Sequence, residues 1–382
     1  MPLVINGTTM DTVYHNGAKM DKYNINGTEV FTSYQAFGNY FYVMGVNDTT
    51  NTSYLVRFNK ASNTMDHLSL SPMRFGYGIA IGMDGSIYIR GADVNGYGIK
   101  AKVNANFTLS YSNFTSLWYM HSSELSYGRD NYLYFLNAGS GNLDKTDTLF
   151  NIQAISTEQF TDSHGQIMFD PWTNKIISSA NSSPVVVHNQ TTLNQEKTFN
   201  WVRSTTESHS LIIDQNYFYW YGYTQDTNYN WLYGIMRLSK TANIDDKGAV
   251  LHSSLDTNLG SSNYFFKDYT NGNYILYTSA GDSNLSGGTG SLFIFNSSWS
   301  LIQYKTQAQI NIPSYSIFVK DMLDPTYYYF LSNQNIIRVN KSTLTIAGTY
   351  TYNSSYITGF SLYSYFSTSG AYNQSDALLN IS

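Results

Sequence analysis

A pair of β-strands recurs along most of this 382-residue chain. The first strand of the pair is aromatic and follows a turn, as in GNYFYV, DNYLYF and PTYYYF. Its first residue after the turn is, in successive copies, Tyr40, Ser86, Tyr132, Lys175, Tyr217, Tyr274 and Tyr327. The second strand ends in a polar turn, with anchors at Asn59, Asn104, Asp144, Asn189, Ser239, Asn296 and Asn340. Both markers repeat every roughly 40 to 57 residues, so they predict seven similar units.

Each unit is expected to contain four antiparallel strands. An apolar strand precedes the aromatic one, as in YGIAIG from Tyr77, and another follows the polar turn, as in LIQYKT from Leu301. Four strands per unit at this period are typical of a β-propeller blade. The alternatives are a β-solenoid, whose coils are shorter, and a β-sandwich array, which would not keep one strand order throughout. We therefore predict an all-β fold with a seven-bladed propeller over residues 31–382.

The end of the chain leaves the number of blades open. After the seventh unit, GFSLYSYFSTSGAYNQSDALLNIS contains further degenerate strands, so eight blades are the alternative to seven. A ring of blades also needs closure, and a strand from one terminus commonly pairs into a sheet formed by the other. The segment TEVFTSY near Glu29 is the strand predicted to complete the last sheet.

The first 30 residues contain a second, shorter repeat. Asn-Gly pairs occur three times at intervals of ten residues, at Asn6-Gly7, Asn16-Gly17 and Asn26-Gly27. Asn-Gly readily adopts two successive positive φ angles, so each pair predicts a type I′ turn in a β-hairpin. Hairpins of this length cannot bury a core of their own. We therefore expect residues 1–30 to form a separate anchor that docks through these turns on another protein.

The composition limits the classes of partner. Charged residues make up 12% of the chain, against roughly 25% in an ordinary soluble domain, so the surface is mostly uncharged. The net charge is 21 − 26 = −5, and without clustered Lys and Arg the chain is not expected to bind nucleic acid. There is no cysteine, no apolar run near the roughly 18 residues of a membrane helix, and no signal peptide at the N-terminus. We expect a chain made in a host cytoplasm and not inserted in a membrane.

One aromatic segment suggests a binding surface. YFYWYGYTQDTNYNWLYG, from Tyr217 to Gly234, combines large rings with amides and a carboxylate, the chemistry that holds sugars. Packing between blades is the alternative explanation and is favoured for Trp220 and Trp231. The candidate ligand-binding residues are Trp220, Tyr223, Asp226, Asn228, Tyr229 and Trp231, with Trp118 and Tyr119 as a second group.

Catalytic and metal motifs are not found in the sequence. Its seven histidines show no metal-site spacing, and neither a nucleophile elbow nor a phosphate-binding loop occurs. Glycosidases need two carboxylates at close range, and four aspartates follow the predicted inner strands: Asp170, Asp214, Asp268 and Asp324. Turn formation explains these aspartates more simply. We predict no catalytic residue, no metal and no cofactor, with a polysaccharide depolymerase as the alternative.

The opening VINGTTMDTVYHNGAKMDKYNINGTEVF resembles the short N-terminal segments of tail, baseplate and accessory structural proteins of tailed bacteriophages. In such proteins this end attaches to the particle and the larger C-terminal domain faces outward. The resemblance therefore implies a non-enzymatic virion protein, present in several copies, that contacts other virion proteins through residues 1–30. Adhesion to host-surface glycan is the function expected of the propeller. A secreted adhesin or archaeal surface protein is a further alternative.

Overall fold

The computed structural model describes six short strands within residues 1–32 and most of the chain from Tyr40 to Tyr363. Outside the described residues are 1–2, 6–7, 11–13, 16–17, 20–21, 26–27, 33–39, 48, 83–84, 116–124, 129, 138–140, 158–164, 171, 181–183, 205–210, 226–230, 253–262, 269, 281–288, 314–315, 320, 322–323, 333, 353–359 and 364–382.

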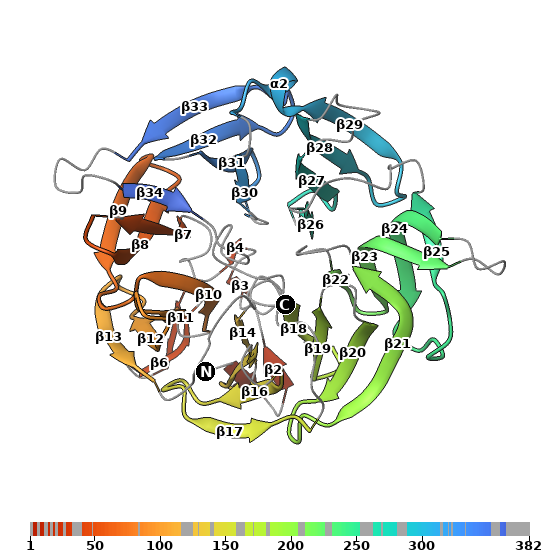
Figure 1. Ribbon diagram of the computed structural model, residues 1–382, viewed down its shortest axis with the longest axis horizontal. Coiled ribbons are helices and arrows are strands. Elements are labelled where there is room, and N and C mark those ends of the chain that lie inside the picture. The colour runs from red at the N-terminus through yellow and green to blue at the C-terminus, as the bar shows by residue number, and fades with distance from the viewer. Residues whose placement is uncertain are drawn as a thin grey trace.

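The protein is a seven-bladed β-propeller (Figure 1). From the axis outward, blade 1 holds β34 (Phe360–Tyr363), β7 (Tyr40–Asn47), β8 (Thr52–Asn59) and β9 (Thr64–Ser69); blade 2 β10 (Phe75–Ile81), β11 (Ile87–Ala92), β12 (Gly98–Val103) and β13 (Leu109–Phe114); blade 3 β14 (Leu125–Tyr127), β15 (Leu133–Leu136), β16 (Leu143–Thr146) and β17 (Ile152–Ile155). Blade 4 holds β18 (Gly165–Asp170), β19 (Lys175–Ala180), β20 (Pro184–Asn189) and β21 (Gln195–Ser204); blade 5 β22 (Leu211–Ile213), β23 (Tyr217–Gln225), β24 (Trp231–Ser239) and β25 (Ala249–His252); blade 6 β26 (Asn263–Lys267), β27 (Tyr274–Ala280), β28 (Thr289–Phe295) and β29 (Leu301–Thr306); blade 7 β30 (Ile317–Val319), β31 (Tyr327–Ser332), β32 (Asn335–Asn340) and β33 (Ile346–Thr351). This arrangement confirms the predicted strand order and the choice of seven blades over eight.

The aromatic strands form the core because each sheet is covered on both sides by its neighbours. In β7, Phe41 and Val43 pack in an apolar cluster with blade 7, whereas Tyr42 and Met44 pack with blade 2. All four side chains are at most 3% exposed. Successive side chains of a strand point to opposite faces, so a strand buried on both faces must be apolar at nearly every position.

The turn between the third and fourth strands is short and similar in six blades, and it is longer in blade 5, between Ser239 and Ala249. One residue in each has a positive φ: Asn63, Phe107, Phe150, Leu193, Gly248, Trp299 and Leu344. A side chain at the start of the turn accepts backbone N–H groups, as Asn340 Oδ1 does from Ser342 N at 2.9 Å. In blade 3 this role belongs to Asp147, which accepts from Leu149 N at 2.8 Å. The predicted anchor Asp144 is therefore wrong by three residues, and it lies inside β16.

Ring closure differs from the prediction. The C-terminal strand β34 pairs antiparallel with β7, from Phe360 opposite Asn47 to Tyr363 opposite Met44, and so completes blade 1 (Figure 1). The TEVFTSY segment does not close the last sheet, because β6 (Thr28–Thr32) pairs with β5 (Lys22–Ile25) instead.

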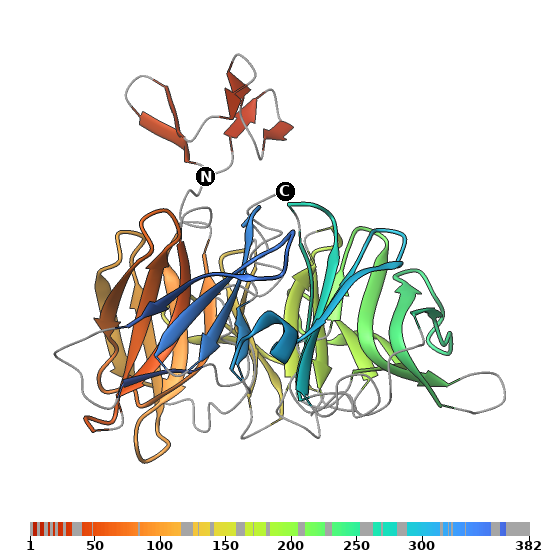
Figure 2. The same cartoon turned by 90° about the horizontal axis from the view of Figure 1, so that it is seen from above.

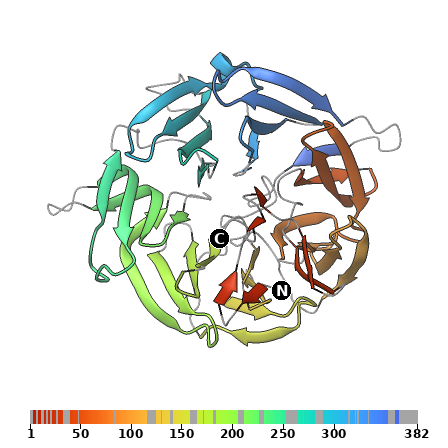
Figure 3. The same cartoon turned by 180° about the vertical axis from the view of Figure 1, so that it is seen from behind.

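The three predicted hairpins are confirmed. They are β1 (Leu3–Ile5) with β2 (Thr8–Met10), β3 (Tyr14–His15) with β4 (Ala18–Lys19), and β5 with β6, and each forms a two-stranded sheet. Figure 2 shows the hairpins outside the ring, on one of its two faces. In Figure 3, which views the ring from that face, the hairpins lie in front of the blades. The Asn-Gly pairs themselves, Asn6-Gly7, Asn16-Gly17 and Asn26-Gly27, lie outside the described residues.

The two faces of the ring carry different turns and connections. β7 starts at Tyr40 and β34 ends at Tyr363 on the face nearer the hairpins, which we call the proximal face. Because the strands alternate in direction, the first-to-second and third-to-fourth turns of each blade also lie there. The second-to-third turns and the connections between blades lie on the opposite, distal face. Helix α2 (Gln307–Ile310) is one such connection, and no helix in the described part of the chain has the length and hydropathy of a membrane span.

Candidate functional site

The aromatic segment predicted to bind sugars forms the second and third strands of blade 5. β23 and β24 pair along their whole lengths. On the distal face β23 ends at Gln225 and β24 begins at Trp231. Tyr223 lies in β23 near the same end. The remaining members of the predicted group, Asp226, Asn228 and Tyr229, fall outside the described residues.

Trp220 is a packing residue. Its side chain is 0% exposed and lies in the apolar cluster between blades 4 and 5, with Met168 and Phe199. A ring buried in this way cannot stack on a ligand at the surface, so Trp220 is removed from the candidate binding group. The sequence pattern could not decide this, because an alternating aromatic strand places rings on both faces of its sheet.

The second candidate group belongs to the same face of the ring. Trp118 and Tyr119 lie in residues 116–124, outside the described residues. The strands on either side, however, end at Phe114 and begin at Leu125 on the distal face. The strands flanking both predicted groups therefore end on the face opposite the hairpins.

One described distal connection is fixed by buried polar contacts. Gln307, at the start of α2, is 3% exposed and donates through Nε2 to the Tyr277 hydroxyl, and its Oε1 accepts from Gly290 N at 3.3 Å. The Tyr277 hydroxyl in turn donates to Ser316 O at 2.7 Å. These bonds join the connection between blades 6 and 7 to the second and third strands of blade 6.

The four candidate catalytic aspartates lie on the proximal face, where they form turns. Asp214 Oδ1 accepts from Asn216 N and Tyr217 N, both at 2.8 Å, and its Oδ2 accepts from the Tyr219 hydroxyl at 2.8 Å. The same arrangement recurs at Asp324, with Thr326 N, Tyr327 N and the Tyr329 hydroxyl at 2.8 Å each. Asp170 and Asp268 also accept turn N–H groups, from Trp172 at 3.1 Å and Thr270 at 3.0 Å. The preference for turn-forming aspartates is thus confirmed.

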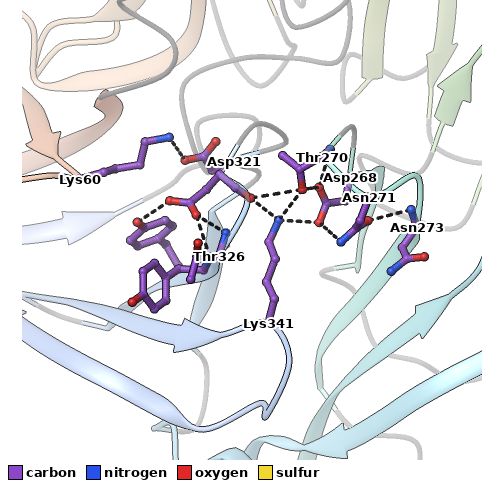
Figure 4. A network of polar contacts seen from close by, with 11 residues as sticks. Lys60, Asp268, Thr270, Asn271, Asn273, Asp321, Thr326 and Lys341 are labelled. Carbon is purple, nitrogen blue, oxygen red and sulfur yellow. Dashed lines mark hydrogen bonds and ion pairs between the residues drawn. The ribbon is translucent and has the colours of Figure 1, made fainter.

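Two of these aspartates, Asp170 and Asp268, have a second role, which is to join blades, and Asp321 joins blades in the same way. The sequence patterns do not by themselves indicate this role. Three lysines reach from one blade to a carboxylate of the preceding blade: Lys60 to Asp321, Lys240 to Asp170, and Lys341 to Asp268, at 2.7, 2.6 and 2.5 Å. Figure 4 shows the first and the last of these pairs. We call them the interblade ion pairs. All six side chains are at most 9% exposed. Each lysine directly follows the anchor of a third-to-fourth turn, which is the sequence signal that could have revealed them.

Burial and pairing act in opposite directions on Lys240. Desolvation lowers the pKa of Lys240, and the hydrogen bond and charge of Asp170 oppose that effect. Lys341 Nζ also donates to Asp324 O at 2.5 Å, so it binds one turn of blade 6 and one turn of its own blade 7. A buried ion pair that is saturated with hydrogen bonds holds elements together, and breaking it by removing one partner is costly.

A different buried carboxylate lies between blades 2 and 3. Asp144 is 0% exposed, and its Oδ2 accepts from Asn137 Nδ2 at 2.9 Å. Desolvation raises its pKa to about 6, against the lowering effects of the Asn137 hydrogen bond and the Arg90 charge. Arg90 is itself 0% exposed and lies over the Phe135 ring, 4.6 Å from its centroid.

The histidines that the structure describes do not gather at one place. Among the described residues, no group of three or more His, Cys, Asp or Glu side chains could hold a metal ion. His188 is fully buried inside blade 4, with Nε2 2.8 Å from Ser178 Oγ and Nδ1 3.2 Å from Leu193 O. His164 and His209 lie outside the described residues.

Comparison with known proteins gives a fold but no family. The sequence matches no protein-family model and no curated protein. A putative 6-phosphogluconolactonase from Bacteroides fragilis is similar in structure, with a TM-score of 0.51 and 12% identity over 82% of this chain and 94% of that one. The dihydro-heme d1 dehydrogenase NirN has a TM-score of 0.49 and 14% identity over 85% of this chain and 66% of that one. Virginiamycin B lyase from Staphylococcus aureus has a TM-score of 0.47 and 12% identity over 73% and 85%.

Proposed function

We propose that this protein is a non-enzymatic structural component of a tailed-phage virion. Residues 1–30 attach it to the particle, and the propeller faces outward, where its distal face binds host-surface glycan. The observation that carries this proposal is that all seven blades have four strands without any contribution from β1 to β6. The hairpins are therefore not part of the ring, and their backbone edges remain available to a partner.

Hairpin edges suit attachment for a physical reason. A two-stranded sheet has unpaired N–H and C=O groups along both edges, and an added strand from a partner satisfies them. An isolated hairpin is at best marginally stable in water, so pairing with a larger surface would also stabilise it. The resemblance of these residues to the N-terminal segments of phage tail and baseplate proteins supports a virion as that surface.

The arrangement of the ring supports outward display. The hairpins lie beyond the proximal face, whereas the strands flanking both aromatic segments end on the distal face. A particle bound at one side would leave the other side free. The candidate catalytic aspartates lie on the proximal face in turns and ion pairs, which favours a binding role over the depolymerase alternative.

Particle attachment tests the proposal. Tagged full-length chain and residues 33–382 are supplied separately during phage assembly, and the particles are then separated on a density gradient. The full-length chain should migrate with particles, and the truncated chain should remain folded by circular dichroism but stay at the top of the gradient. Equal incorporation of both chains would overturn the anchor.

Point variants provide a second test, because they keep the full length of the chain and change only the hairpin turns. Gly7→Val, Gly17→Val and Gly27→Val together oppose the positive φ that an Asn-Gly turn requires. This variant should lose attachment, whereas Leu301→Ala, on an exposed side chain of the outermost strand of blade 6, should retain it.

A further inference from the structure

A hollow of about 440 Å³ opens on the distal face at the outer part of blade 2. Its lining residues come from the turn between β11 and β12 and from the end of β13: Asp93, Asn95, Tyr97, Gly98, Phe114 and Thr115. The volume lies within the range of roughly 300 to 1,000 Å³ that small-molecule sites occupy. None of these residues was singled out from the sequence.

Two exposed aromatic rings border the hollow. Phe114 is 58% exposed and Tyr97 is 45% exposed, although rings of this size are usually covered. Their segments are held side by side, because Thr115 N donates to Gly98 O at 3.0 Å. Gly98 has no side chain to fill the space next to Tyr97. Both rings therefore present exposed apolar surface beside the hollow.

Hydrogen bonds within the Asp93–Tyr97 turn hold the polar groups of the hollow in place without a ligand. Asp93 is 7% exposed, and its Oδ1 accepts from Asn95 N at 2.9 Å and from Tyr97 N at 2.8 Å. Its Oδ2 accepts from Asn95 Nδ2 at 3.3 Å, which orients the exposed amide. A carboxylate has about four acceptor positions, so Oδ2 retains capacity for a further donor. A turn ordered in this way loses little entropy when a ligand binds.

We infer that this hollow is a binding subsite for a neutral saccharide, with room for one or two sugar rings. Tyr97 and Phe114 stack on the C–H faces of the sugar, the Asn95 amide and Asp93 Oδ2 bind its hydroxyls, and Thr115 lies at the rim. The inference rests on the proposed glycan adhesion and gives it a site. In the sequence it lies near the second predicted aromatic group, since Trp118 and Tyr119 come three and four residues after Thr115.

Saturation-transfer NMR on the full-length chain tests the inference. The probes are the methyl glycosides of glucose, galactose, mannose, rhamnose and N-acetylglucosamine. At least one of them should receive saturation, and Tyr97→Ala and Phe114→Ala should each weaken its binding at least tenfold. Tyr97→Phe keeps the ring and should stay within about threefold of the unaltered protein, because ring stacking is the main contribution.

Controls distinguish a saccharide subsite from self-association through the same rings and from particle attachment. Leu301→Ala changes an exposed apolar side chain of blade 6 and should leave glycoside binding unchanged. No saturation of any of the five glycosides, or binding that both alanine variants leave intact, would overturn the subsite. A dimer that forms with concentration in sedimentation and is abolished by Phe114→Ala would assign the rings to self-association and would also overturn it. Particle attachment through residues 1–30 does not involve the hollow, so either proposal can fail while the other stands.

Discussion

Lys60 in blade 1 donates to Asp321 in blade 7, with 2.7 Å between Nζ and Oδ2, and so joins the first and last blades of the ring. The lysine side chain is 7% exposed and the aspartate 1%. The two residues are 261 positions apart in the chain, so this contact exists only once the ring has closed.

Lys60→Met is expected to destabilise the protein strongly. The substitution leaves the Asp321 carboxylate buried without its cation, and such losses cost about 3 to 5 kcal/mol. Urea denaturation of the two proteins measures the difference in free energy of unfolding. Asp66→Ala is the matched control, because the Arg57–Asp66 pair also spans 2.7 Å but its aspartate is 55% exposed. That change should cost about 1 kcal/mol or less, and equal losses would contradict the role of burial.

The ring itself could be predicted from the sequence, and its interblade contacts could not. Strand order and blade number follow from local features, namely aromatic alternation and turns, that repeat at a regular spacing. The interblade ion pairs join residues 70 or more positions apart, and nothing local shows which lysine meets which aspartate. The strand that closes the ring could not be identified, because FSLY in β34 is as short and apolar as many other segments. The turn of blade 3 is misplaced because GNLDK has the sequence pattern of a strand that ends in a polar turn, although Asp147 and not Asp144 accepts the turn N–H groups.

The sequence predicts the residue types of the candidate site but not their positions on the ring. Rings beside amides and carboxylates do occur on the distal side, but Trp220 is buried between blades. The hollow at Tyr97 and Phe114 was not found, since GADVNGYGI contains the Gly and Asn of an ordinary turn, and Phe114 is more than ten residues away from it. Only the pairing of β12 with β13 brings the two together.

Removal of β34 tests ring closure. A chain that ends before Phe360 leaves β7 with an unpaired edge at the axis of blade 1, and such edges favour aggregation. We expect a lower melting temperature and concentration-dependent association in light scattering. A chain that ends after Tyr363 keeps β34 and should melt close to the full-length protein. If both truncations behave alike, β34 does not close the ring.

The raised pKa of Asp144 predicts a specific dependence of stability on pH. In the unfolded chain this carboxyl ionises near 3.8, but in the folded protein only near 6. Between these values the folded state binds more protons than the unfolded state, so ionisation favours unfolding as the pH rises. The stability of the protein relative to Asp144→Asn should therefore fall between about pH 4 and pH 6, by as much as about 3 kcal/mol. Any constant offset from the substitution does not affect this slope, and a flat difference curve across that window would exclude the shift.

Trp220→Ala is expected to lower stability by about 3 to 5 kcal/mol, as removal of a fully buried large ring does. Trp172→Ala serves as the control. Its ring is 38% exposed and lies 4.9 Å from Lys240 Nζ, so the loss should be about 1 kcal/mol. Guanidinium denaturation measures both. A mild effect at Trp220 would show that its surroundings are not a packed core.

Antibody labelling of intact particles tests the proposed attachment and display most directly. One epitope tag is placed at the N-terminus, before the first hairpin strand, and another is inserted at Gly96 in the distal turn, where an added Cβ would meet no atom within 4 Å apart from the two chain neighbours. In electron micrographs of intact virions, gold should decorate the Gly96 tag, and the tag at residue 1 should become accessible only after the particles are disrupted. Labelling of residue 1 on intact virions with the Gly96 tag hidden, or no labelling of particles at all, would contradict the account.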